Sequence, residues 1–252
     1  MNEERYPSLY APKDGYVFVV TYGRSGSTLT QSLLNSIPGY CIRGENGNLL
    51  YHFSRAAAVV SNWDNFTWRQ DEILKPIDQR RKEIADTFAT PKDPWYGAEN
   101  VNTDEFSRAM MDLFVREVLH IPEQTRVAGF KEIRFHEDRN FFHSYLETIK
   151  KYFPNSRFIF QTRDYSSVSQ SGWWKSRNKS DVKAMVEAAD QLYKNFSENN
   201  PSICYTIEYE RYSEGTKYTR ELFDFLRESP DMDKVSEILR EKLIHCPPEH
   251  YT

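Results

Sequence analysis

The chain has 252 residues, of which 28% are charged and 39% hydrophobic, and its formal net charge is −4. This length fits one α/β unit with a sizeable core, so we treat residues 1–252 as a single domain. The slight acidic excess argues against nucleic acid as the main partner, because nucleic-acid-binding proteins usually present a basic face. No apolar run reaches the roughly 18 residues of a transmembrane helix, and we expect a soluble, cytoplasmic protein.

The first predicted strand, residues 16–21, leads directly into a turn rich in glycine and serine, T-Y-G-R-S-G-S-T-L. Apolar residues then recur at helical spacing as far as Ser36. A strand, a glycine turn and a helix start in this order direct backbone N–H groups at a phosphate. Arg24 adds a fixed positive charge inside the turn. The other donors of this turn come from Ser25, Gly26, Ser27 and Thr28.

This turn differs from the loop of nucleotide-hydrolysing proteins, which reads G-x-x-x-x-G-K-[ST] and uses its Lys and hydroxyl on terminal phosphates and Mg²⁺. Gly26 is followed by Ser27 instead of Lys, and the positive charge comes earlier, at Arg24. The pattern therefore predicts an anion-binding loop without metal-dependent phosphoryl transfer, and we expect no metal site.

Strands and helices alternate along the rest of the chain. Further strands are predicted at 127–131, 157–162 and 203–207. Helices are predicted at 54–63, 73–88, 104–120, 141–153, 181–199, 217–227 and 234–242. Thr103 or Asp104 would cap the helix at 104–120. This alternation predicts a mostly parallel sheet that is covered by helices on both faces.

A second candidate phosphate site follows the strand at 157–162, where the sequence continues R-D-Y-S-S-V-S-Q-S. Arg163 stands at the end of the strand, and Ser171 comes eight positions later. An arginine and a hydroxyl placed in this way converge on one phosphate group. Since the two motifs are independent and far apart in the chain, together they indicate a ligand with two anionic groups.

The two motifs resemble those of the sulfotransferase family. The turn after the first strand is similar to the 5′-phosphosulfate loop of the members that carry Arg in it (R-S-G-[ST]-[ST]), among them carbohydrate, tyrosylprotein and some bacterial sulfotransferases. Arg163 and Ser171 match the spacing of the family's 3′-phosphate motif. The resemblance implies a P-loop NTPase-like three-layer α/β fold, with a central, mostly parallel sheet flanked by helices.

The resemblance also implies a reaction and a donor. The donor is 3′-phosphoadenosine 5′-phosphosulfate (PAPS), and a sulfuryl group passes to a hydroxyl or amine, which leaves adenosine 3′,5′-bisphosphate. By this likeness Arg163 and Ser171 bind the 3′-phosphate. The residues that bind the 5′-phosphosulfate are Arg24, Ser25, Gly26, Ser27 and Thr28, and Arg24 also takes part in catalysis.

Sulfuryl transfer needs a general base, because the acceptor must lose a proton. Glu45, in R-G-E-N-G, is the leading candidate, since a Glu in a similar context serves as base in related enzymes. His52 and His136 are the rival bases. Lys131 ends a predicted strand and would point into the ligand crevice, near the sulfuryl group by the family likeness. Its neighbour Glu132 would pair with Lys131 or Arg134, or recognise acceptor hydroxyls.

The acceptor is less well defined. Aromatic residues interleave with charges in 48–103, and this segment and 172–200 are candidate caps over a carbohydrate or a small metabolite. Two other functions remain open, namely a P-loop nucleotide kinase or NTPase, and a non-catalytic binder of nucleotide or glycan. Monomer and homodimer are both open. Cys41, Cys204 and Cys246 lack metal-ligand spacing, and we expect reduced thiols.

Overall fold

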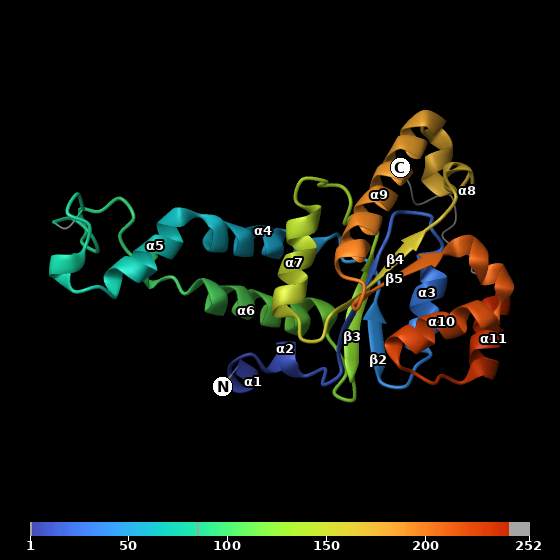
Figure 1. Ribbon diagram of the computed structural model, residues 1–252. Coiled ribbons are helices and arrows are strands. Elements are labelled where there is room, and N and C mark those ends of the chain that lie inside the picture. Colours follow the sequence, from blue (N-terminus) through green and yellow to red (C-terminus); the bar gives the residue numbers. More distant parts are fainter. Residues whose placement is uncertain (1, 85, 242–252) are drawn as a thin grey trace.

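A single sheet of five parallel strands lies at the centre of the computed structural model, which describes residues 2–84 and 86–241 (Figure 1). The strands lie in the order β2-β3-β1-β4-β5. Their bounds are Gly15–Val20 (β1), Tyr40–Arg43 (β2), Val127–Glu132 (β3), Arg157–Thr162 (β4) and Cys204–Glu208 (β5). After β1 the chain continues to β2 at one edge of the sheet, and after β4 it continues to β5 at the opposite edge. The carboxyl ends of β1 and β4 therefore flank a topological switch point, where ligands of such sheets bind.

Helices cover both faces of the sheet and make a three-layer fold. Every residue of β1 is buried, and its alternate side chains enter two separate apolar clusters. Phe18 packs against Phe130 and Phe158 on the face that is covered by α6, α7 and α9. Val17 and Val19 lie on the opposite face with side chains from α3, α10 and α11. The predicted fold class is thus confirmed.

The main helices of the described residues lie both before and after β3 in the sequence. On the N-terminal side of β3 they are α1 Asn2–Arg5, α2 Pro7–Tyr10, α3 Ser27–Asn35, α4 Leu49–Asn62, α5 Asp64–Ile73 and α6 Thr103–Phe114. Beyond β3 they are α7 Phe142–Tyr152, α8 Tyr165–Ser169, α9 Lys179–Asn199, α10 Thr216–Leu226 and α11 Met232–Arg240. Short 3₁₀ turns lie at Ile77–Gln79, Ala98–Asn100, Gly172–Ser176 and Tyr209–Glu214, and a π-helical turn, Val115–Leu119, extends α6.

Several local predictions were wrong, among them the lack of a helix over residues 64–72, where α5 lies. The strand β2 was missed, because it has only four residues at the edge of the sheet. The helix predicted at 73–88 is absent, and the described part of this segment holds only the 3₁₀ turn Ile77–Gln79, which follows Pro76. The cap of α6 is Asn102, whose side-chain oxygen accepts from the Glu105 N–H.

The segment between β2 and β3 forms an arm, α4 to α6, which extends away from the sheet in Figure 1. Ion pairs hold its tip together. The Arg69 side chain is only 4% exposed, bonds to Asp93 and lies 3.8 Å from a Glu99 carboxylate oxygen. The rings of Trp68 and Phe88 lie near its guanidinium group.

No helix among residues 2–84 and 86–241 is long and apolar enough to cross a membrane. Cys41 and Cys204 are free thiols, in line with the expectation, and Cys204 is buried. Cys246 lies outside the described residues.

Candidate active site

The loop between β1 and α3 presents backbone N–H groups at the switch point. Arg24 and Gly26 both have positive φ, 69° and 84°, and this turns the chain sharply into α3. A left-handed conformation is uncommon for a residue other than glycine and often marks a functional site. The Leu29 N–H of the first turn of α3 donates to the Gly26 carbonyl at 3.0 Å, and no side chain caps the N–H groups before it. They form a ready site for an anion.

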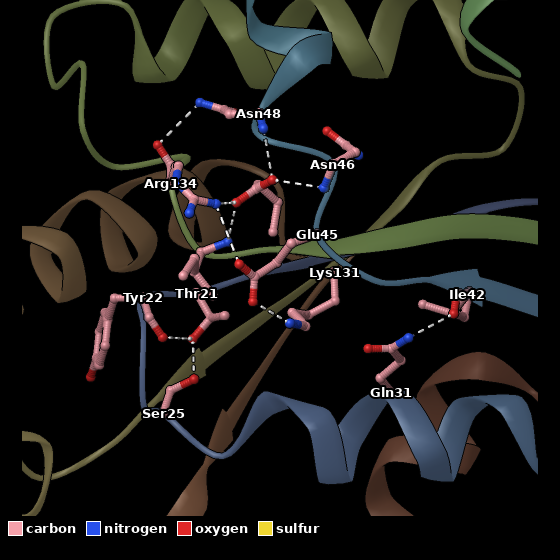
Figure 2. Close-up of polar contacts among 12 residues, drawn as sticks. Thr21, Tyr22, Ser25, Gln31, Ile42, Glu45, Asn46, Asn48, Lys131 and Arg134 are labelled. Carbon is pink, nitrogen blue, oxygen red and sulfur yellow. Dashed lines mark hydrogen bonds and ion pairs between the residues drawn. The ribbon is translucent and has the colours of Figure 1, made fainter. Parts of the chain in front are cut away.

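Ser25 shapes this loop from the inside. Its side chain is fully buried, and its hydroxyl accepts a hydrogen bond of 2.7 Å from Thr21 Oγ1 (Figure 2). The Gln161 side chain on β4 donates to the Ser25 carbonyl at 2.8 Å. The Ser25 hydroxyl therefore faces the sheet. Ser27, which is buried, and Thr28, which is half-buried, stand in the first turn of α3, and their hydroxyls have no hydrogen bond among the described residues.

The two predicted phosphate-binding motifs meet in space. Arg24 Nε donates to Ser171 Oγ at 2.9 Å, and Arg163 Nη1 donates to the Arg24 carbonyl at 2.9 Å. Arg163 Nε is buried and has no partner in the described part of the chain. Asp164 caps the short helix α8 that separates Arg163 from Ser171. The structure thus brings Arg24, Arg163 and Ser171 together at the ends of β1 and β4.

Aromatic side chains cover the loop. Trp173 and Trp174 belong to the predicted cap segment 172–200, and Tyr209 was missed by sequence reasoning. A Cβ on Gly23 would lie 2.4 Å from the Trp173 ring, and one on Gly26 would lie 2.1 Å from the Tyr209 ring. The Trp174 ring N–H donates to the Gly23 carbonyl at 3.0 Å. These contacts require glycine at both positions, and their partners lie too far along the chain for the sequence to reveal them.

A cavity of about 400 Å³ adjoins the loop. Its lining residues come from the loop, from the segments after β2 and β3, and from the 3₁₀ turn after Ser171: they are Gly23, Glu45, Ile133, Arg134, His136, Glu137, Trp173 and Trp174. A groove of about 500 Å³ lies between α4 and α7. It contains none of the predicted site residues, so we take the smaller cavity as the acceptor site.

Glu45 and Lys131 face each other beside this cavity (Figure 2). Lys131 Nζ donates to Glu45 Oε1 at 2.6 Å, and Arg134 Nη1 donates to Glu45 Oε2 at 3.3 Å. The Lys131 side chain is 8% exposed and that of Glu45 is 35% exposed. The predicted pairing of Lys131 with Glu132 was wrong, because Lys131 pairs with Glu45. Recognition of an acceptor by Glu132 is excluded as well, since its side chain is fully buried.

The two rival bases lie in different places. His136 lines the cavity, is nearly buried, and its Nδ1 has no partner among the described residues. Burial lowers the pKa of His136 to about 4, although a hydrogen bond with the Thr21 backbone opposes the shift. His52 lies exposed on α4 and does not line the cavity.

Comparisons with known proteins agree with this geometry. No curated protein matches the chain. Two solved structures share the fold: the sulfotransferase domain of the Synechococcus PCC 7002 olefin synthase (16% identity, TM-score 0.54) and the sulfotransferase domain from the curacin biosynthetic pathway (15% identity, TM-score 0.51). Each comparison covers 90% of this chain and 78% of the other. A sequence profile described as the sulfotransferase family matches residues 16–230. The chain therefore belongs to the sulfotransferase family.

Proposed function

We propose that the protein transfers a sulfuryl group from PAPS to a hydroxyl or amine of a small-molecule or glycan acceptor. The observation that carries this proposal is the contact between the two anion-binding motifs. Arg24 bonds to Ser171, and Arg163 bonds to the backbone of Arg24. A donor with a 5′-phosphosulfate and a 3′-phosphate needs two such groups close together at one sheet edge.

The residues present fit this donor. The first-turn N–H groups of α3 and the Arg24 guanidinium suit the 5′-phosphosulfate, because both offer donors to an oxyanion. The buried Arg163 Nε lacks a partner in the described part of the chain, so a ligand phosphate would satisfy it. Ser171 would exchange its bond from Arg24 for one to the same 3′-phosphate. Ser27 and Thr28 supply further donors, while Ser25 keeps the loop in shape.

The chemistry assigns separate tasks to the charged side chains. Glu45 takes the proton of the acceptor as its oxygen or nitrogen bonds to sulfur. The bond from sulfur to the bridging oxygen breaks, and its electron pair stays on the departing adenosine 3′,5′-bisphosphate. Arg24 and Lys131 stabilise the negative charge that grows on that side. The Lys131 amino group lies 2.6 Å from Glu45, so it would lie near the sulfur when Glu45 contacts the attacking group of the acceptor.

The cavity walls favour a ring-shaped acceptor. Trp173 and Trp174 offer flat apolar faces, and the exposed side chain of Glu137 offers acceptors for hydroxyl groups. This combination suits a carbohydrate or a small hydroxylated metabolite.

A ligand panel followed by thermal unfolding tests the donor. Adenosine 3′,5′-bisphosphate should raise the melting temperature by mass action, and AMP, ADP and ATP should raise it far less. A larger shift with ATP, together with Mg²⁺-dependent ATP turnover, would instead indicate a nucleotide kinase. Transfer of labelled sulfate from PAPS to a mixture of sugars and phenols then tests the reaction itself.

A further inference from the structure

The carboxylate of Glu132, at the end of β3, is fully buried and accepts four hydrogen bonds. Its Oε2 accepts from the backbone N–H groups of Asn46 at 3.2 Å and Asn48 at 2.8 Å. Its Oε1 accepts from the Ile133 N–H at 2.8 Å and from Arg134 Nη1 at 2.9 Å. A buried carboxylate is costly unless donors surround it, and here both oxygens are fully engaged.

Two of these bonds fix the backbone that carries Glu45. Asn46 and Asn48 follow Glu45 in the loop between β2 and α4 (Figure 2). Glu132 ties this loop to β3. Asn48 has a positive φ of 57°, and its side-chain oxygen accepts from the Tyr145 hydroxyl at 3.1 Å. Two buried side chains therefore hold the loop. Glu132 binds its backbone at Asn46 and Asn48, and Tyr145 binds the Asn48 side chain.

Arg134 connects the Glu132 carboxylate with the Glu45 carboxylate itself. Arg134 Nη1 contacts both Glu132 Oε1 at 2.9 Å and Glu45 Oε2 at 3.3 Å. Lys131 holds the other oxygen of Glu45. Both oxygens of the candidate base are thus oriented by residues close to Glu132 in the sequence, Lys131 within β3 and Arg134 just beyond its end.

We propose that Glu132 is a positioning residue for sulfuryl transfer, which holds Glu45 towards the donor loop through the 46–48 backbone and through Arg134. This inference rests on the proposed function, in which Glu45 takes the proton of the acceptor. A purely structural anchor would lower the stability of the protein and leave the turnover of the folded molecules unchanged. A positioning residue lowers kcat in the folded protein as well.

The first test is Glu132→Gln, which keeps the shape of the side chain and turns one acceptor into a donor. We expect kcat to fall by about 10- to 100-fold, because small misplacements of reacting groups cost this much. Affinity for adenosine 3′,5′-bisphosphate should stay within about twofold, since the Glu132 side chain bonds to residues 46, 48, 133 and 134 and only its backbone carbonyl, which the substitution keeps, bonds to the donor loop. The matched control is Asp112→Asn: Asp112 is buried and accepts from the Leu9 N–H at 2.9 Å, far from the site. It should lower stability and leave kcat unchanged.

The second test is a double-mutant cycle with Glu45→Gln. If Glu132 acts through Glu45, adding Glu132→Gln to Glu45→Gln should leave kcat where the single Glu45 variant puts it. An unchanged kcat in Glu132→Gln, or an additive loss in the double variant, would overturn the proposal. Arg134→Gln provides the same cycle if Glu132→Gln does not fold, because the Arg134 side chain is 38% exposed.

The proposed function fails on different evidence. Absence of bisphosphate binding or of sulfate transfer by the unmodified protein would reject the reaction as a whole. A Glu45→Gln variant with full turnover would reject Glu45 as base, and the positioning role of Glu132 with it, while the sulfotransferase reaction would stand.

Discussion

Arg24 and Ser171 are 147 positions apart in the chain and are joined by one hydrogen bond of 2.9 Å from Nε to Oγ. This bond connects the loop after β1 with the turn after α8. The all-parallel sheet makes it possible, because the carboxyl ends of β1 and β4 are neighbours at the switch point. Each motif alone is a short pattern, and their contact makes them one candidate binding site.

Replacing Ser171 should therefore weaken donor binding selectively. We expect Ser171→Ala to reduce the affinity for adenosine 3′,5′-bisphosphate by about tenfold, since a hydrogen bond to a charged group contributes about 1.5 kcal/mol or more. AMP, which lacks the 3′-phosphate, should bind as before. Isothermal titration measures both. Ser167→Ala is the control, because the Ser167 hydroxyl has no bond among the described residues; an equal loss there would contradict the assignment.

Gly26 lies where no side chain fits. A Cβ would come within 2.1 Å of the Tyr209 ring, and the backbone has a φ of 84°. We expect Gly26→Ala to lower the free energy of unfolding by at least about 1 kcal/mol and to lose most of the donor affinity, as measured by urea denaturation and bisphosphate titration. Adding Tyr209→Ala should restore part of the stability, because it removes the overlap and leaves the backbone strain. If Tyr209→Ala restores no stability, the overlap between the new Cβ and the Tyr209 ring is not what destabilises Gly26→Ala.

The buried His136 predicts how stability depends on pH. Its pKa falls from 6.5 to about 4 in the folded protein, so between these values the unfolded chain binds more protons than the folded one. The contribution of His136 is complete above pH 6.5 and is lost as the pH falls towards 4, by about 3 kcal/mol in total. Urea denaturation from pH 4 to 8 should show this slope, and His136→Gln should flatten it. His52→Gln, on the exposed surface of α4, should keep the slope of the unmodified protein.

The stability of the arm tip depends on Arg69. Arg69→Ala would leave the buried carboxylates of Asp93 and Glu99 without their cation, a change that costs about 3–5 kcal/mol locally. We expect faster proteolysis within residues 74–97 and unchanged bisphosphate binding, because the tip does not contact the donor loop. Lys183→Ala, which removes an exposed ion pair on α9, should change neither. Loss of bisphosphate binding in the Arg69 variant would show that the arm and the donor site are coupled.

The sequence predicted the parts of the fold that have strong local signals. The buried strands and the amphipathic helices gave clear periodicity, and four of the five strands lie within a residue of their predicted bounds. β2 was missed because a four-residue edge strand is too short for its alternation to stand out. The prediction of a helix at 73–88 was wrong. Charged residues of this segment instead make contacts within the arm tip, where Glu72, just before it, accepts hydrogen bonds from Lys75 and from the Arg81 backbone across a turn.

Local sequence patterns indicate candidate site residues, but they do not indicate most of the side chains that these residues contact in the fold. Motif spacing identified Arg24, Arg163 and Ser171, whose contact needs only the parallel order of β1 and β4. The pairing of Lys131 with Glu45 instead of Glu132 depends on how the loop after β2 crosses the end of β3. The packing of Tyr209 on Gly26 joins positions that no local pattern connects. Such contacts are set by tertiary structure alone.

The arm leaves the sheet just after β2 and returns at β3, and these two strands are neighbours. The segment after β2, where the arm begins, is joined to β3 by the contacts that hold Glu45, which come from Lys131, Arg134 and Glu132. Movement of the arm at this point would therefore be passed to Glu45, the proposed base. Changes in the length of the arm beyond α4 would leave these contacts intact, so the reach of the arm can vary while the surroundings of Glu45 stay the same.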